Sequence, residues 1–186
     1  MATELARVRF SVDDYHRMAE AGILHEDARL ELIGGEIVQM SPVGSRHAAC
    51  VKRLNRLLGR RLGDEAVLGV QDPVRLGDDT EPEPDVMILR PREDFYEQAA
   101  PTAADVVLLI EVADSSLAYD RAIKLPRYAQ AGVPEVWLVD LDGQAIERHT
   151  LPAEAGFLDV RRFVRGTALA SLAVPRLVVP VDTVLG

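Results

Sequence analysis

The 186-residue sequence predicts one α/β domain, in which a mixed central β-sheet is flanked by α-helices. Three observations lead to this fold class. The runs AVLGV (66–70), DVMIL (85–89) and VVLLIEV (106–112) are short and apolar, and the last is continuous, as in strands covered on both faces. A helical pattern separates 106–112 from the next apolar run, VPEVWLVDL (133–141), which predicts a crossover between neighbouring strands. No repeat, low-complexity tract or long linker divides the chain.

The first third of the chain predicts a helix, a hairpin and a second helix. Ser11 is placed to cap a helix through about Ala21, with an acid three residues after the cap and a glycine at the end. The segment RLELIGGEIVQM (29–40) alternates apolar and polar residues around two glycines, which is typical of a two-stranded hairpin. From His47 to Leu62 the apolar side chains recur at helical spacing, and the basic residues fall largely on other faces.

Further strands and one more helix complete the predicted sheet. A helical segment spans about 119–131 and ends at a glycine, and the buried run 133–141 follows it. A DG turn then leads into QAIERHTL (144–151), and GFLDVRRFV (156–164) is a further strand candidate. The C-terminal segment ALASLAVPRLVVPVDTVL (168–185) contains several prolines and has no clean period.

Composition and charge limit the classes of function. The formal net charge of −9 at pH 7 opposes strong nonspecific affinity for nucleic acid, because phosphate neutralisation supplies most of that affinity. The single cysteine, Cys50, excludes an internal disulfide and a cysteine-based zinc site, and we expect it to be a small buried side chain. No long apolar run predicts a membrane span, and the N-terminus lacks a secretory pattern, so we expect a cytoplasmic protein.

Two acidic residues lie in predicted buried strands. In EPEPDVMILRP (81–91) two prolines mark the entrance of a strand, and Asp85 lies directly after them. In DVVLLIEVADSS (105–116) Glu111 interrupts an otherwise apolar strand. Neighbouring buried carboxylates repel each other unless a cation separates them, and Mg²⁺ commonly binds one or two carboxylates. One interpretation is therefore a shared divalent ion; the other is that Asp85 caps a turn and Glu111 pairs with an arginine.

Lys124, in the helical segment after Glu111, has two interpretations. Asp120 precedes it by four residues, in the order that favours an ion pair on one helix face. Alternatively, the ammonium group lies at an active site and holds a phosphate oxygen or the attacking water. The spacing is compatible with both.

Several motifs together resemble one known protein family. The runs EPDV (83–86), LLIEVADSS (108–116) and YDRAIKLPRYAQAGVPEVWLVDL (119–141) follow one another, and LELIGGEIVQMSP (30–42), a histidine and an amphipathic helix precede them. In order and spacing they resemble the Uma family of restriction endonucleases, a branch of the PD-(D/E)XK nuclease superfamily. The resemblance extends over nearly the whole chain and implies a single restriction-endonuclease-like domain over residues 1–186.

The resemblance implies four catalytic residues, which are Asp85, Glu111, Lys124 and Glu31. The first two would be ligands of Mg²⁺ or Mn²⁺, and the backbone carbonyl of Val112 would add a third ligand. The lysine that usually follows the second acid by two residues is replaced by Ala113, and Lys124 matches the family from the following helix instead. Glu31 would complete the site, and Asp120 would orient the lysine.

The activity implied by the resemblance is metal-dependent hydrolysis of phosphodiester bonds in DNA. We also expect a homodimer, because symmetric pairing is common among small soluble chains. A competing hypothesis keeps the fold as a non-catalytic binding or regulatory module, which the net charge and the alanine at position 113 favour. A third is hydrolysis of another phosphate ester. A Lys124 side chain directed into solvent would favour the binding module.

Three further features have two interpretations each. His47 shares the apolar stripe of its helix, so it is either a core or boundary residue or a group that reaches the site opening. Trp137 is more simply a core residue than a base-stacking platform. The densest basic set is either a solvated helix face or a surface that follows phosphates; it comprises Lys52, Arg53, Arg56, Arg60 and Arg61.

Overall fold

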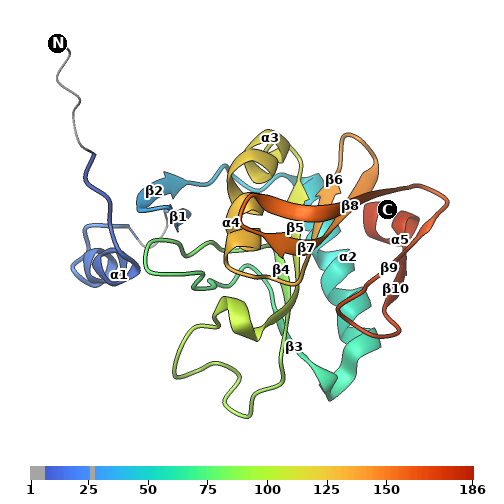
Figure 1. Cartoon of the computed structure of the whole chain (residues 1–186), viewed down its shortest axis with the longest axis horizontal. Coiled ribbons are helices and arrows are strands. Elements are labelled where there is room, and N and C mark those ends of the chain that lie inside the picture. The colour runs from blue at the N-terminus through green and yellow to red at the C-terminus, as the bar shows by residue number, and fades with distance from the viewer. Residues whose placement is uncertain (1–6, 26–27) are drawn as a thin grey trace.

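A six-stranded mixed sheet lies at the centre of the computed structural model, which describes residues 7–25 and 28–186 (Figure 1). In spatial order the strands are β3 (Val67–Gly69), β4 (Val86–Leu89), β5 (Val106–Ala113), β6 (Glu135–Asp140), β7 (Ala145–Ala153) and β8 (Gly156–Val164). Strands β5 and β6 are parallel, and the other neighbours are antiparallel. The predicted fold class, with its crossover between the two most apolar strands, is confirmed.

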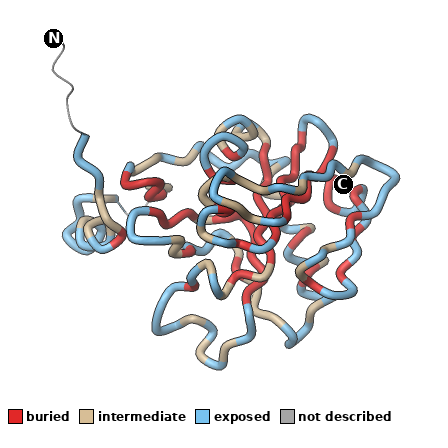
Figure 2. The backbone as a smooth tube through the Cα atoms, in the orientation of Figure 1, coloured by how far each residue is buried: buried red, intermediate tan, exposed pale blue. Residues whose placement is uncertain are grey.

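Helices cover both faces of this sheet. One face carries α2 (Ser45–Leu62) and α5 (Val181–Leu185); the other carries α3 (Leu117–Tyr119), a π-helical turn η3 (Asp120–Lys124) and α4 (Leu125–Gln130). Because side chains alternate along a strand, Val86 and Ile88 pack in the core beneath α2, whereas Met87 and Leu89 pack in the core beneath α4. Figure 2 shows the buried residues concentrated along the sheet between these layers.

The N-terminal elements form as predicted and are tied to the sheet through one short segment. Helix α1 (Val12–Glu20) begins with a reciprocal capping box between Ser11 and Asp14. Strands β1 (Leu30–Ile33) and β2 (Glu36–Gln39) form the hairpin. Leu32 and Glu81 exchange two backbone hydrogen bonds of 3.3 and 2.7 Å, which attach this hairpin to the chain just before β4.

The crossover helix lies where predicted, but it is not one regular helix. Its middle turn is π-helical, and the Leu125 N–H donates to the Asp120 carbonyl five residues earlier. Pro126, in the first turn of α4, explains the change, because its ring lacks an N–H and would collide with a carbonyl of the preceding α-helical turn. A π-helical turn accommodates one extra residue, so it rotates the side chains before Pro126 relative to a regular helix.

The C-terminal segment forms β9 (Ala168–Ala170), β10 (Val178–Pro180) and α5, at the end of the molecule opposite α1 (Figure 1). The buried carboxylate of Glu135 anchors it by accepting from the Leu172 and Ala173 N–H groups at 2.7 and 2.8 Å. Trp137 donates to the same carboxylate, and both Trp137 and Cys50 are fully buried, as predicted. No helix among the described residues is both long and apolar enough to cross a membrane.

Candidate active site

Asp85 and Glu111 face each other across two neighbouring strands. Val86 pairs with Ile110 in the antiparallel ladder of β4 and β5, so the residues one step beyond that pair are directly opposed. Opposed residues of an antiparallel pair project from the same face of the sheet. A hydrogen bond of 2.8 Å from the Val112 N–H to Asp85 Oδ2 holds the Asp85 carboxylate against β5. The strand register therefore brings both predicted acids to one end of the sheet.

Lys124 is buried and contacts two of the predicted acids. Its Nζ donates to Glu31 Oε1 at 2.8 Å and to Glu111 Oε1 at 3.2 Å. In the described part of the chain Lys124 makes no ion pair with Asp120, which instead accepts a hydrogen bond from Ser116 at 2.6 Å. Of the two interpretations of Lys124, the structure thus has the ammonium group among the acids and not in a local helical pair.

Glu31 reaches this cluster from the N-terminal hairpin. It lies in β1, is almost fully buried, and accepts a 2.8 Å hydrogen bond from the Glu83 N–H on the same oxygen that binds Lys124. The backbone contacts of Leu32 with Glu81 hold the hairpin in register with the segment that leads to Asp85. All four predicted site residues are therefore in one place, although they come from β1, the start of β4, β5 and η3.

Burial strongly affects the protonation of Glu111. It raises the pKa of Glu111 to about 8; Lys124 opposes this rise, and the negative charge of Asp85 adds to it. Burial alone would lower the pKa of Lys124, but the Glu111 and Glu31 carboxylates outweigh it and the pKa is raised. The Tyr128 hydroxyl donates to Glu111 Oε1 at 2.5 Å. At neutral pH Glu111 thus tends to keep its proton until a further cation arrives.

The cluster lies at the wall of an open cleft of about 510 Å³. Of the described residues that line it, two are permanently cationic, Arg29 and Lys124. Six are acidic, and these are Glu31, Glu83, Asp85, Glu111, Asp114 and Asp120. Burial also raises the pKa values of Glu83 and Asp120. The excess of carboxylates over cations gives the cleft a negative potential, which attracts cations and repels a bare phosphate.

The donor set fits a cation that retains water ligands. Both hydrogen bonds that the Glu111 carboxylate accepts within the described chain end on Oε1, so Oε2 is available to another partner. No three His, Cys, Asp or Glu side chains among residues 7–25 and 28–186 are grouped closely enough to hold an ion by themselves. Mg²⁺ in proteins is commonly held by one or two carboxylates with water completing the shell. Asp85 and Glu111 offer such a pair.

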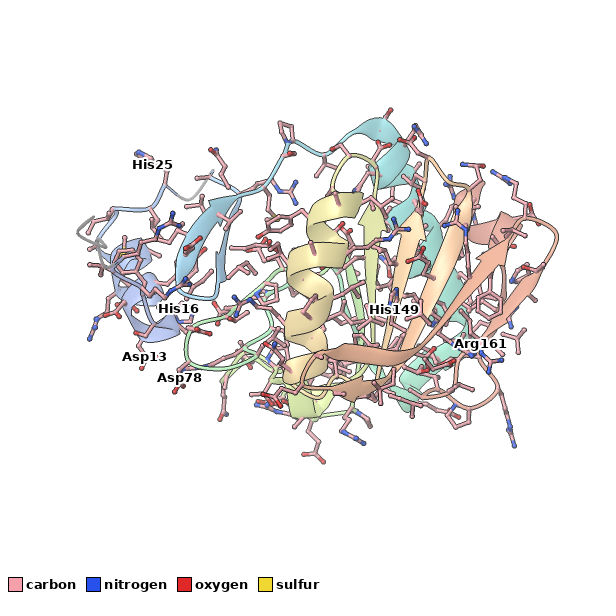
Figure 3. All side chains as sticks on the ribbon, turned by 45° about the horizontal axis from the view of Figure 1, so that its top comes forward. Asp13, His16, His25, Asp78, His149 and Arg161 are labelled. Carbon is pink, nitrogen blue, oxygen red and sulfur yellow. The ribbon has the colours of Figure 1, made fainter. Side chains whose placement is uncertain are left out.

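His47 also belongs to this site. Its Nε2 lies 3.0 Å from Asp85 Oδ2, and its Nδ1 is buried without a hydrogen-bond partner in the described chain. The helical stripe indicated that His47 faces inward, and its position in the first turn of α2 lets it meet the end of the sheet instead of the core centre. The other histidines lie elsewhere: Figure 3 shows His16 and His25 on the α1 side and His149 across the molecule.

The basic set on α2 divides into two groups. Arg53 donates to the Val184 and Leu185 carbonyls at 2.9 and 2.7 Å, so it holds α5 against α2. The remaining members are exposed, and they are Lys52, Arg56, Arg60 and Arg61. Contact of this exposed group with phosphate stays a prediction.

Comparison with known proteins points to one family and one fold. A family model named Uma2, described as "Putative restriction endonuclease", matches residues 12–182. Among solved structures the chain is similar to a protein of Anabaena variabilis described as "a putative nuclease belonging to DUF820". The two share 17% identity and a TM-score of 0.72, over 95% of this chain and 97% of that one. At this identity the likeness shows the fold alone. A search of curated proteins gives no match.

Proposed function

The chain belongs to the Uma2 family, and from this premise we propose that it is a metal-dependent endonuclease that hydrolyses phosphodiester bonds of DNA. The observation that carries the proposal is the contact of Lys124 with Glu111, in a cleft that Asp85 and Glu31 also line. Burying a lysine and paired acids at a strand end costs folding free energy, because each charge loses its hydration. Such a cluster therefore indicates a catalytic site more than a structural one. The same contact weighs against the binding-module hypothesis, which needs no lysine in the cleft.

Each residue of the cluster has a distinct role in this proposal. Asp85 and Glu111 hold Mg²⁺ or Mn²⁺, and such an ion supplies charge stabilisation and a water of lowered pKa when bound. The Val112 N–H and His47 keep the Asp85 carboxylate oriented. Lys124 stabilises negative charge that develops on the phosphate, and Glu31 keeps the ammonium group directed into the cleft.

The first experiment measures nicking of supercoiled plasmid with Mg²⁺ or Mn²⁺ at low salt. We expect the unmodified protein to cleave and Asp85→Asn to reduce the rate by about 100-fold or more, the scale on which positioned catalytic groups act. Asp78→Asn is the matched control, because its side chain is 99% exposed and lies on the α1 side of the molecule (Figure 3).

Three outcomes would contradict this proposal. Cleavage that persists in Asp85→Asn would mean a contaminant or another site. Preferential cleavage of an RNA of matched length would contradict DNA as the substrate. Absence of cleavage together with absence of Mg²⁺ binding in calorimetry would favour the non-catalytic module.

A second prediction concerns His47. We expect His47→Ala to weaken Mn²⁺ binding by about 10–100-fold, because a group that orients a metal-binding carboxylate typically contributes this much. Isothermal titration calorimetry measures the effect without any nucleic acid. His25→Ala is the control, because His25 is exposed and lies away from the cleft (Figure 3). Equal affinity in His47→Ala and the unmodified protein would show that the Val112 N–H and the Gln71 side chain, which donates to Asp85 Oδ1 at 3.3 Å, are sufficient to orient Asp85.

A further inference from the structure

Strand β8 is a long edge of the central sheet, and it carries three charged residues, Asp159, Arg161 and Arg162. It has nine residues and pairs only with β7, whereas the strand at the other edge, β3, has three. Within the described chain, the backbone groups of 157–163 make no hydrogen bond outside the ladder with β7. Alternate residues of an edge strand direct their N–H and C=O groups outward, where another strand can pair with them. Strand β8 contains neither proline nor lysine, two residues that commonly block such pairing.

Exposed apolar side chains gather on the same hairpin. On β8, Leu158, Val160 and Val164 are 75%, 51% and 48% exposed, and Leu151 on the adjacent β7 is also exposed. These four belong to the eleven exposed large hydrophobic residues of the described chain. An apolar group of this kind along an unpaired strand is typical of a surface that another chain covers.

We propose that β8 pairs antiparallel with β8 of a second copy of this chain, about a two-fold axis at Val160, to form a homodimer with one continuous sheet. In this register Val160 faces itself, and Asp159 of each copy faces Arg161 of the other. Phe157 and Phe163 are likewise opposed. Opposite charges and aromatic residues in directly opposed positions each stabilise an antiparallel pair. The proposal is independent of nuclease activity.

Symmetry and charge together favour this register. Directly opposed positions alternate between hydrogen-bonded and non-hydrogen-bonded pairs, so a two-fold axis between antiparallel strands must pass through a residue that faces itself. An axis at Asp159, Arg161 or Arg162 would place identical charges opposite each other, which is destabilising. An axis at Val160 places an apolar residue at the centre and opposite charges on both sides. This self-complementarity is the reason to assign a second copy, and not another protein, to the edge.

The test is the oligomeric state of the full chain, measured by sedimentation equilibrium. We expect a dimer for the unmodified protein. Arg161→Asp faces Asp159 of the other copy with a like charge, and Asp159→Arg does the same with Arg161, so each should weaken dimerisation by at least about tenfold. The double variant restores opposite charges and should restore the dimer. Arg161 has a side chain that is 66% exposed and lies on the β8 side of the molecule (Figure 3), and its Nε also donates to Asp159 of the same chain at 3.4 Å.

A control variant and a folding check separate loss of the β8–β8 pairing from general damage to the protein. Lys52→Glu reverses an exposed charge on α2 and should leave the dimer unchanged. Circular dichroism checks that each variant is folded, which matters because Asp159 also accepts from Thr150 at 3.1 Å and from Arg161 of its own chain at 3.4 Å. A monomer at all concentrations, a dimer that survives Arg161→Asp, or a folded double variant that stays monomeric would each overturn the proposal.

Discussion

Replacing Lys124 by methionine is expected to reduce the free energy of unfolding by about 3–5 kcal/mol at pH 8, the cost of removing one partner of a buried ion pair. Methionine preserves most of the side-chain volume, so the loss is electrostatic. Without the ammonium group, the buried Glu31 carboxylate loses its cation partner, and Glu111 loses the cation that opposes the rise of its pKa. Because Glu111 is neutral well below its raised pKa, the loss should be smaller at pH 5 than at pH 8. Urea unfolding at both pH values measures the difference.

The exposed Lys52 provides the matched control for this prediction. Lys52→Met removes the same charge from a solvated helix face, where we expect an effect within about 0.5 kcal/mol. A Lys124→Met protein that is as stable as the unmodified one at pH 8 would mean that the ammonium group does not compensate buried negative charge at this site. Equal losses at pH 5 and pH 8 would mean that the lysine contributes through packing and not through charge.

The sequence could predict that Asp85 and Glu111 lie opposite each other, because the positions of both residues follow from strand register. Two prolines fix where β4 begins, and Glu111 interrupts a continuous apolar strand, so both acids are located by local patterns. Lys124 could be predicted only in part. A regular helix would pair it with Asp120, whereas the π-helical turn before Pro126 turns it toward the sheet, and helical spacing does not reveal that turn.

The contacts of Glu31 and His47 could not be located from the residues alone. Glu31 joins the cluster through a hairpin that is attached to the segment before β4 by backbone hydrogen bonds, and such contacts carry no side-chain signature. The family resemblance indicated Glu31, but it gave no partner for it. The apolar stripe predicts that His47 faces inward from α2, but it does not specify which end of the sheet the helix covers, and the contact with Asp85 depends on that. Both depend on packing between distant elements.

Replacing Glu111 by glutamine is expected to reduce the rate of the proposed cleavage by about 100-fold or more. The same replacement is expected to stabilise the protein at alkaline pH. The folded-state pKa of Glu111 is raised from 4.5 to about 8. The folded protein therefore binds a proton that the unfolded chain releases, so Glu111 lowers stability progressively as pH rises from about 4.5 through 8. Glutamine is neutral throughout and keeps an oxygen that can accept from Tyr128. The stability gain should thus be small at pH 5 and on the order of a few kcal/mol at pH 8.5.

Urea unfolding between pH 4.5 and pH 8.5, repeated with Mg²⁺, separates the two consequences of this substitution. Glu36→Gln is the control, since that carboxylate is exposed on β2 and lies outside the cleft. Mg²⁺ should stabilise the unmodified protein most at high pH, where Glu111 has lost its proton, and should have little effect on Glu111→Gln. A constant difference between the two proteins across the pH range would mean that Glu111 is ionised throughout. Glu111→Gln should therefore be more stable and less active than the unmodified protein. This is expected for a buried catalytic acid, because burial disfavours the same negative charge that would bind the metal ion.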